Sequence, residues 1–192
     1  IGQTHLVGKD KVLSNLVKNK KLFSMILYGK PGIGKTTIAT AITEELGLKY
    51  RMLNAVINNK KDFDIVVEEA KMYGELVVIM DEIHRLNKDK QDLLLSYVEN
   101  GLITLIGMTT ANPFHSINPA IRSRCHLIEF KVSDKDNIKQ VLLNALKSEN
   151  GLNNKYICDE EVIEKIANLS NGDIRYALNA LEILSLSSEN NH

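Results

Sequence analysis

The sequence predicts a three-layer α/β fold with a parallel five-stranded sheet, followed by an all-α C-terminal subdomain. Short apolar runs alternate with helical patterns from about residue 25 to residue 131, and the strand signals stop after that point. Repeated strand-then-helix order favours a parallel sheet covered by helices. We therefore expect an α/β domain at residues 1–132 and a helical lid at residues 133–192.

Five segments have the composition of buried strands. Residues 76–80 and 103–108 are nearly continuous apolar runs, which is typical of parallel strands covered on both faces. Between strands, Ile38, Ile42 and Leu46 recur at helical spacing. The expected strands are residues 24–28, 49–55, 76–80, 103–109 and 126–131.

The C-terminal part reads as three helices, at residues 134–148, 159–169 and 172–184. Asp173 is a plausible N-terminal cap for the last of them, whose Ile174, Leu178 and Leu181 form one apolar stripe. A tail of about 60 residues is small for an independent core, so we expect a helical lid packed on the α/β domain.

Composition excludes several classes of protein. Lys plus Arg equals Asp plus Glu at 24 each, whereas a protein that holds nucleic acid by bulk charge should be basic. Two cysteines are too few for a disulfide framework or a four-thiolate zinc site, which indicates a reducing compartment and no transition metal. No apolar run approaches the roughly 18 residues of a membrane span, and no signal-peptide pattern opens the chain. We expect a piece of a longer, cytoplasmic protein.

Residues 29–36 read Gly-Lys-Pro-Gly-Ile-Gly-Lys-Thr, which matches G-x-x-x-x-G-K-[ST] between an expected strand and an expected helix. Glycines let successive backbone N–H groups point at phosphate oxygens, and the helix N-terminus adds positive charge. Lys35 places a full charge on the terminal phosphates, and Thr36 offers a hydroxyl to Mg²⁺. The sequence therefore predicts a nucleotide site made by Gly29, Lys30, Pro31, Gly32, Ile33, Gly34, Lys35, Thr36 and Thr37.

A second expected strand, residues 76–80, runs directly into two carboxylates. Asp81 at the strand end can hold the Mg²⁺ shell, and Glu82 can polarise a water for attack on the γ-phosphate. A small-molecule kinase does not need this second acid, so the pair favours hydrolysis. Residues 87–90 (Asn-Lys-Asp-Lys) are near the guanine-reading N-K-x-D, but their fourth position is Lys90, and they read as the start of a solvated helix.

At this point the chain resembles the AAA+ ATPases, within them the clamp-loader clade, and most of all the RarA/MgsA family of replication-associated recombination proteins. The resemblance covers nearly the whole chain. It rests on residues 2–8 (Gly-Gln-Thr-His-Leu-Val-Gly), 24–29, 81–88 (Asp-Glu-Ile-His-Arg-Leu-Asn-Lys), 99–101 and 106–113 (Ile-Gly-Met-Thr-Thr-Ala-Asn-Pro).

The resemblance implies further site residues. Thr110 looks like the first sensor beside the γ-phosphate, with Asn112 as the alternative. Arg124 looks like the arginine finger offered to a neighbouring subunit, with Arg122 as the alternative. Arg175 looks like the second sensor in the lid. The wall against the adenine ring is expected from His5, Val7 and Gly8.

The resemblance also implies a homo-oligomeric, nucleoid-associated ATPase that acts with the single-strand-binding protein on single-stranded DNA, DNA ends or stalled forks. The family's C-terminal oligomerisation region is expected to be missing from these 192 residues. Three alternatives stay open: a processivity-clamp loader subunit, a RuvB-like branch-migration motor, and a nucleotide-gated switch that barely hydrolyses. Lys30 stands where the family's usual loop has a proline, which predicts a less rigid loop.

Overall fold

The computed structural model describes Leu6, residues 11–149 and residues 151–189, and in it the chain folds as two compact units. The α/β unit contains His5–Gly29 and Lys35–Phe130. The helical unit contains the chain from Lys131 onward, and the loop Lys30–Gly34 is grouped with it.

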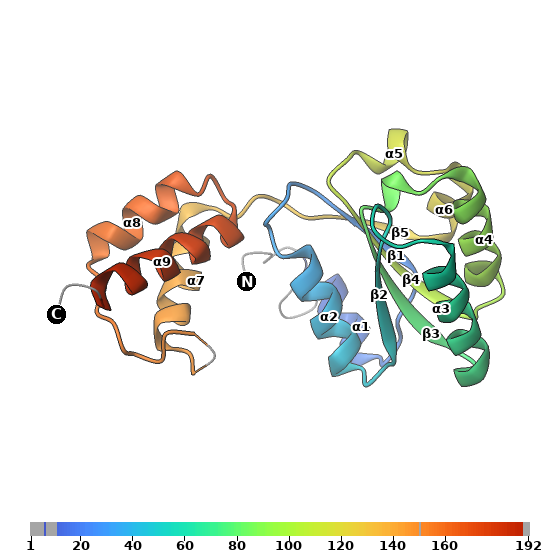
Figure 1. Cartoon of the computed structure of the whole chain (residues 1–192), viewed down its shortest axis with the longest axis horizontal. Coiled ribbons are helices and arrows are strands. Elements are labelled where there is room, and N and C mark those ends of the chain that lie inside the picture. Colours follow the sequence, from blue (N-terminus) through green and yellow to red (C-terminus); the bar gives the residue numbers. More distant parts are fainter. Residues whose placement is uncertain (1–5, 7–10, 150, 190–192) are drawn as a thin grey trace. The chain divides into compact units, whose positions relative to one another are not determined.

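The α/β unit is built on a five-stranded parallel sheet in the order β2-β3-β4-β1-β5, which confirms the predicted fold class (Figure 1). The central strands are almost completely buried, because helices cover both faces and leave no position for a polar side chain in the middle of the sheet. The strands are β1 (Met25–Tyr28), β2 (Tyr50–Asn54), β3 (Leu76–Asp81), β4 (Ile103–Thr109) and β5 (His126–Glu129).

Helices form the outer two layers of this unit. Figure 1 shows α1 and α2 on one side of the sheet and α3 and α4 on the other. The core on the α3 side joins strand residues such as Val78 and Leu105 to Phe63 and Val66 of α3 and Leu94 of α4. The longer helices are α1 (Val12–Lys18), α2 (Lys35–Glu45), α3 (Lys60–Tyr73) and α4 (Lys88–Glu99).

Helix ends in this unit follow local chemistry. The Asn87 side chain accepts a hydrogen bond from the Lys90 N–H, so residues 87–90 do begin a helix, as expected. Three short helical turns lie outside the expected pattern: η1 (Ile83–Arg85), α5 (Pro113–Ser116) and α6 (Pro119–Arg124). Both α5 and α6 begin with Asn-Pro, in which the Asn side chain caps and the proline occupies a position that needs no N–H.

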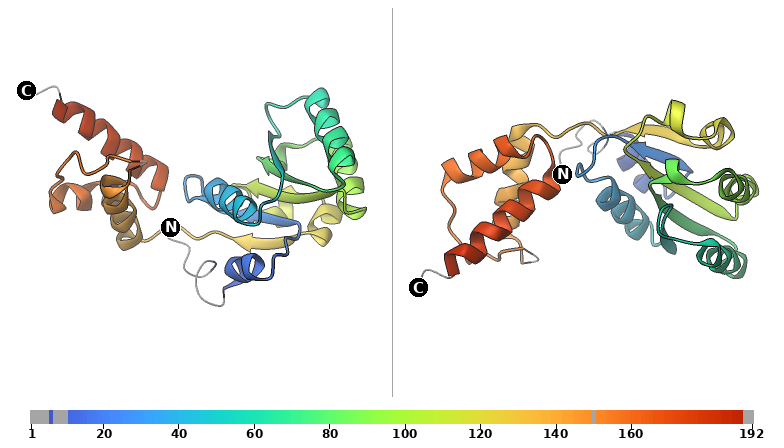
Figure 2. Two further views of the ribbon diagram at one scale, coloured as in Figure 1. Left: turned by 90° about the horizontal axis from the view of Figure 1, so that it is seen from below. Right: turned by 45° about the horizontal axis from the view of Figure 1, so that its top comes forward.

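The helical unit contains α7 (Lys135–Lys147), α8 (Glu160–Leu169) and α9 (Ile174–Glu189), which pack on one another (Figure 2). The Asp173 side chain accepts a hydrogen bond from the Tyr176 N–H, so the predicted cap is confirmed. Helix α9 continues five residues beyond its expected end. The core of the unit is made by Ile138, Leu142, Leu146, Ile163, Ile166, Ala167, Ile174, Ala177 and Leu181. None of the helices in the described ranges has the length and hydropathy that a membrane span requires.

Candidate active site

The carboxyl ends of three neighbouring strands meet at one edge of the sheet and carry the predicted site. β1 ends where the phosphate loop begins, β3 ends at Asp81, and β4 ends at Thr109 between them. The Gly29 N–H donates a hydrogen bond to the Thr109 carbonyl at 3.2 Å, which holds the first residue of the loop against β4. In open parallel sheets this edge is where ligands bind.

The phosphate loop connects β1 to α2 and needs its glycines for backbone reasons. Gly32 and Gly34 have φ angles of +72° and +91°, which side-chain-bearing residues rarely adopt. Lys35, at the start of α2, is 8% exposed, and its ammonium donates to the Gly29 carbonyl at 2.8 Å. Its charge is therefore held at the mouth of the loop, where the terminal phosphates of a nucleotide would lie.

The oxygen donors at this edge fit a magnesium ion. Mg²⁺ prefers carboxylate and hydroxyl oxygens and keeps several of its waters, so one or two protein ligands are enough. Asp81 supplies a carboxylate, one oxygen of which accepts the Glu82 N–H at 2.9 Å, and Thr36 in the first turn of α2 supplies a hydroxyl. When bound, Mg²⁺ would neutralise charge on the β- and γ-phosphates.

Glu82 has an unusual backbone conformation. Its φ and ψ are +52° and +37°, in the left-handed region, and its carbonyl accepts from the Arg85 N–H at 2.8 Å to close η1. Such a conformation costs a non-glycine residue about 1–3 kcal/mol and tends to occur at functional sites. The turn takes the chain out of β3 directly after Asp81, and the Glu82 side chain is 31% exposed.

Two threonines at the end of β4 have different environments. Thr110, the predicted first sensor, is exposed directly after β4, whereas Thr109 is 1% exposed and bonds to His84. Asn112, the alternative sensor, uses its side chain to cap α5 through the Phe114 N–H. The pairing of Thr109 with His84 is not predictable from the sequence, because nothing in their spacing of 25 residues indicates that they touch.

The two candidate fingers have different environments. Arg122 donates to the Phe114 carbonyl at 2.8 Å and lies over the Phe114 ring, so it supports α5. Arg124 is half exposed and pairs with Glu99 at 2.6 Å. Burial raises the pKa of the adjacent Cys125 thiol to about 12, which keeps it neutral and leaves it a packing role.

The remaining predicted residues belong to the helical unit, to the N-terminal segment and to the start of α2. Arg175 is exposed on α9 of the helical unit. His5, Val7 and Gly8, predicted to pack against adenine, fall outside the described residues. Thr37 is exposed in the first turn of α2.

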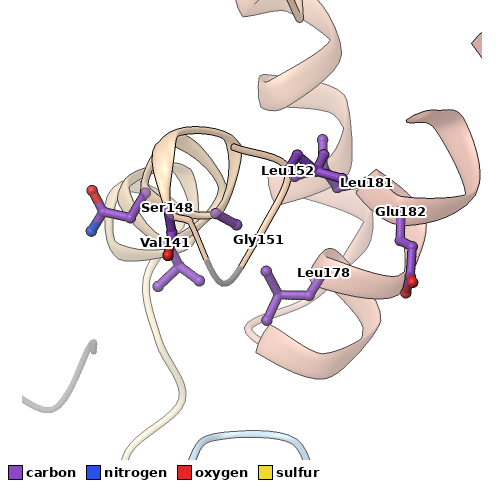
Figure 3. Close-up of a pocket in the computed structure, with 9 residues that line it drawn as sticks. Val141, Ser148, Gly151, Leu152, Leu178, Leu181 and Glu182 are labelled. Atoms are coloured by element: carbon purple, nitrogen blue, oxygen red, sulfur yellow. The ribbon is translucent and has the colours of Figure 1, made fainter. Parts of the chain in front are cut away.

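A pocket of about 560 Å³ lies within the helical unit, between α7, the chain that follows it, and α9 (Figure 3). Apolar side chains such as Val141, Leu152 and Leu178 dominate its wall. Of the described residues predicted to bind nucleotide, none lines it. Among the described residues that line it, there is no lysine or arginine that could bind a phosphate group.

The fold and the phosphate edge together define an ATPase of the AAA class. Residues 25–133 match the family model for "ATPase family associated with various cellular activities (AAA)", and the chain belongs to this family. Residues 151–186 match a lid domain of the RCF1/5-like AAA+ ATPases.

Individual proteins are also similar to this chain. The chain is 54% identical to replication-associated recombination protein A of Bacillus subtilis over 98% of its own length and 45% of that protein. It is 41% identical to the protein of the same name in Coxiella burnetii, over 96% of this chain and 43% of that one. It therefore spans less than half the length of these relatives. Among solved structures it resembles the RuvB Holliday junction branch migration motor of Thermotoga maritima, with a TM-score of 0.74 and 27% identity over 88% of this chain and 57% of that one.

Proposed function

We propose that this chain is the ATP-hydrolysing module of a protein that maintains DNA replication and recombination, acting at stalled forks or DNA ends. The observation that carries the ATPase step is the meeting of Lys35 and the Asp81–Glu82 pair at one edge of the sheet, with β4 between them. Mg²⁺ is proposed to take Thr36 and Asp81 as protein ligands. Glu82 is proposed to accept a proton from the attacking water.

The DNA role, the assembly and the location rest on resemblance. The relatives that match this chain are more than twice its length, and several are named for replication-associated recombination. We propose that the intact protein is a homo-oligomer bound to the nucleoid in the cytoplasm, with the single-strand-binding protein as a partner. Residues 1–132 and 133–192 are proposed to act as nucleotide-binding domain and lid.

In this mechanism, Lys35 and the loop N–H groups hold the triphosphate, and Thr110 orients the attacking water. Arg124 from a neighbouring subunit offsets charge on the transferred phosphoryl group. Arg175 reaches the same phosphates from the lid. Release of both arginines after hydrolysis would let the lid change its angle.

The RuvB-like motor is the less favoured DNA role. Such a motor is expected to carry an extra hairpin before the fourth strand. Here α4 passes into β4 through Asn100, Gly101 and Leu102, and Gly101 has a φ of +76° that makes the tight turn. This connection has no room for a hairpin. A clamp-loader subunit is the nearer alternative, because its resemblance to this chain requires no such hairpin.

The decisive experiment compares the intact oligomer with its Glu82→Gln variant. We expect phosphate release to fall by about 10²–10⁴-fold, because general base catalysis is lost while the fold and the nucleotide site persist. Titration calorimetry should show ATP binding in both proteins. Equal and negligible hydrolysis in both, with ATP still bound, would instead identify a nucleotide-gated switch.

The DNA role is tested separately. Hydrolysis by the intact protein should rise when single-stranded or tailed duplex DNA is added, compared with blunt duplex of the same length. Absence of stimulation by every DNA would contradict a DNA-associated motor and leave the ATPase assignment in place.

A further inference from the structure

His84 connects the proposed base to the end of a neighbouring strand. Its Nδ1 lies 2.9 Å from the Thr109 hydroxyl, and its Nε2 lies 3.4 Å from a carboxylate oxygen of Glu82. The imidazole is 13% exposed and Thr109 is 1% exposed, so water competes little for the first of these contacts. Both nitrogens of one ring therefore face partners on different elements.

The Glu82 carboxylate favours one tautomer of this ring. The Ala111 N–H donates to the Thr109 hydroxyl oxygen at 3.0 Å and occupies one of its two lone pairs, so the hydroxyl proton is free to point at the His84 Nδ1. A neutral imidazole that accepts at Nδ1 carries its proton on Nε2. The Nε2 atom lies 3.4 Å from an oxygen of the Glu82 carboxylate, which is an acceptor. The opposite tautomer would place a lone pair against a carboxylate oxygen.

The backbone around His84 is held in place. His84 sits in η1, which is closed by the bond between the Arg85 N–H and the Glu82 carbonyl. Ile83, between Glu82 and His84, is 1% exposed and packs on Gly107 of β4, where an added Cβ would come within 2.8 Å of its side chain. The missing side chain at Gly107 thus lets the turn sit close to β4.

Thr109 also touches the phosphate loop. Its carbonyl accepts from the Gly29 N–H, while its hydroxyl bonds to His84. Thr109 therefore contacts Gly29 of the phosphate loop through its backbone, and it contacts His84 through its side chain.

We propose that His84 is a positioning residue that orients the Glu82 carboxylate through its Nε2–H and ties that orientation to Thr109 beside the phosphate loop. The inference rests on the proposed role of Glu82 as base. His84 touches neither nucleotide nor water in this account. It restricts the rotamers of Glu82, so that the carboxylate is aligned only when the end of β4 is in place.

Two substitutions separate positioning from support of the fold. In His84→Gln the amide group takes the place of Nε2 and can still donate to Glu82. In His84→Asn the amide takes the place of Nδ1 and can still pair with Thr109, but it cannot reach Glu82. The proposal expects His84→Gln to keep most of the kcat of the intact oligomer. It expects His84→Asn and His84→Ala to lose about 10- to 100-fold in kcat, because misplacement of a catalytic group by about an ångström has that effect.

The controls use the same protein. ATP affinity by calorimetry should stay within about twofold in all His84 variants, because the loss lies in kcat and the phosphate loop is intact. His115→Ala, at an exposed position on α5, should retain the parent kcat. Thr109→Val should lower kcat, Thr109→Ser should not, and the double variant Thr109→Val/His84→Ala should lose less than the product of the two single losses.

Each outcome decides the question. If His84→Asn is as active as or more active than His84→Gln, the histidine supports Thr109 and does not orient Glu82, and the proposal is wrong. If His84→Ala does not fold, the Gln and Asn pair still decides. If Glu82→Gln is inactive while every His84 variant keeps the parent kcat, the proposal fails and the ATPase assignment survives. If Glu82→Gln keeps full activity, the proposed function itself fails.

Discussion

The two units of this protein place their polar groups by different rules. In the α/β unit, residues far apart in the sequence meet at one sheet edge, because parallel strands bring all their carboxyl ends to the same side. In the helical unit, three amphipathic helices bury one stripe each and spread their polar residues over the surface. One predicted catalytic residue, Arg175, lies there. The candidate cluster at the sheet edge is thus a product of sheet topology, whereas the helical unit holds a single predicted site residue.

The largest expected effect concerns Arg124. Arg124→Ala should lower hydrolysis by the intact oligomer by about 10³–10⁵-fold, the usual contribution of an arginine finger. If the finger acts on a neighbouring subunit, mixed oligomers of Arg124→Ala and Glu82→Gln should regain activity that neither variant has alone. Phosphate release from mixtures at varied ratios checks this, with Arg122→Lys as the comparison. If no mixture regains phosphate release, Arg124 either acts on the nucleotide of its own subunit or is not an arginine finger.

The two cysteines, one in each unit, should differ in reactivity. Burial raises the pKa of Cys125 from 9.0 to about 12, so at equal pH its thiolate fraction is about 10³-fold below that of an unperturbed thiol. Burial also raises the pKa of Cys158, with a smaller contribution from Asp159. We expect iodoacetamide to label Cys158 first, as followed by mass spectrometry of Cys125→Ser and Cys158→Ser variants.

The same shift makes stability depend on pH. Folding favours the neutral Cys125 thiol, so its contribution is complete below about pH 9 and is lost as the pH rises toward about 12. Cys125→Ser should remove this alkaline loss. Equal labelling of both cysteines in the folded protein would contradict the burial of Cys125.

Core truncations compare the interiors of the units. Ile79 of β3 and Leu142 of α7 are both 0% exposed, so Ile79→Ala and Leu142→Ala should each lower the free energy of unfolding by about 2–5 kcal/mol. Denaturant titration measures both, with Ile79→Val and Leu142→Met as conservative controls. Ile79→Ala should also weaken ATP binding, because β3 carries Asp81 two residues further on. If Leu142→Ala loses more ATP affinity than Ile79→Ala, the idea that the nucleotide site depends mainly on the core of the α/β unit is wrong.

The smallest effects are expected at two helix caps. Asn87→Ala on α4 and Asp173→Ala on α9 each remove a side chain that accepts a backbone N–H, and each should cost about 1 kcal/mol of unfolding free energy. Asn87→Asp and Asp173→Asn keep the acceptor and serve as controls. If the alanine variants match their controls in denaturant titration, the caps do not stabilise these helices.

Local patterns predicted most of the fold. Each strand was expected within about two residues of its observed bounds, because a continuous apolar run between turn signals is a property of neighbouring residues. The short helices α5 and α6 were missed, since four to six residues hold too little periodicity. The end of α9 was placed early because Ser185 and the residues after it lack a strong apolar stripe, although Ser185 itself is buried.

The sequence by itself determined the order of strands and helices and the candidate chemistry, because the phosphate loop and the acidic pair are runs of adjacent residues. Only the tertiary structure decided which side chains touch. Thr109 rather than Thr110 meets His84, and Arg122 rather than Arg124 supports α5. The first of these contacts depends on the register of β3 against β4 and on the left-handed turn at Glu82, which are set by packing across the sheet and cannot be seen in local spacing.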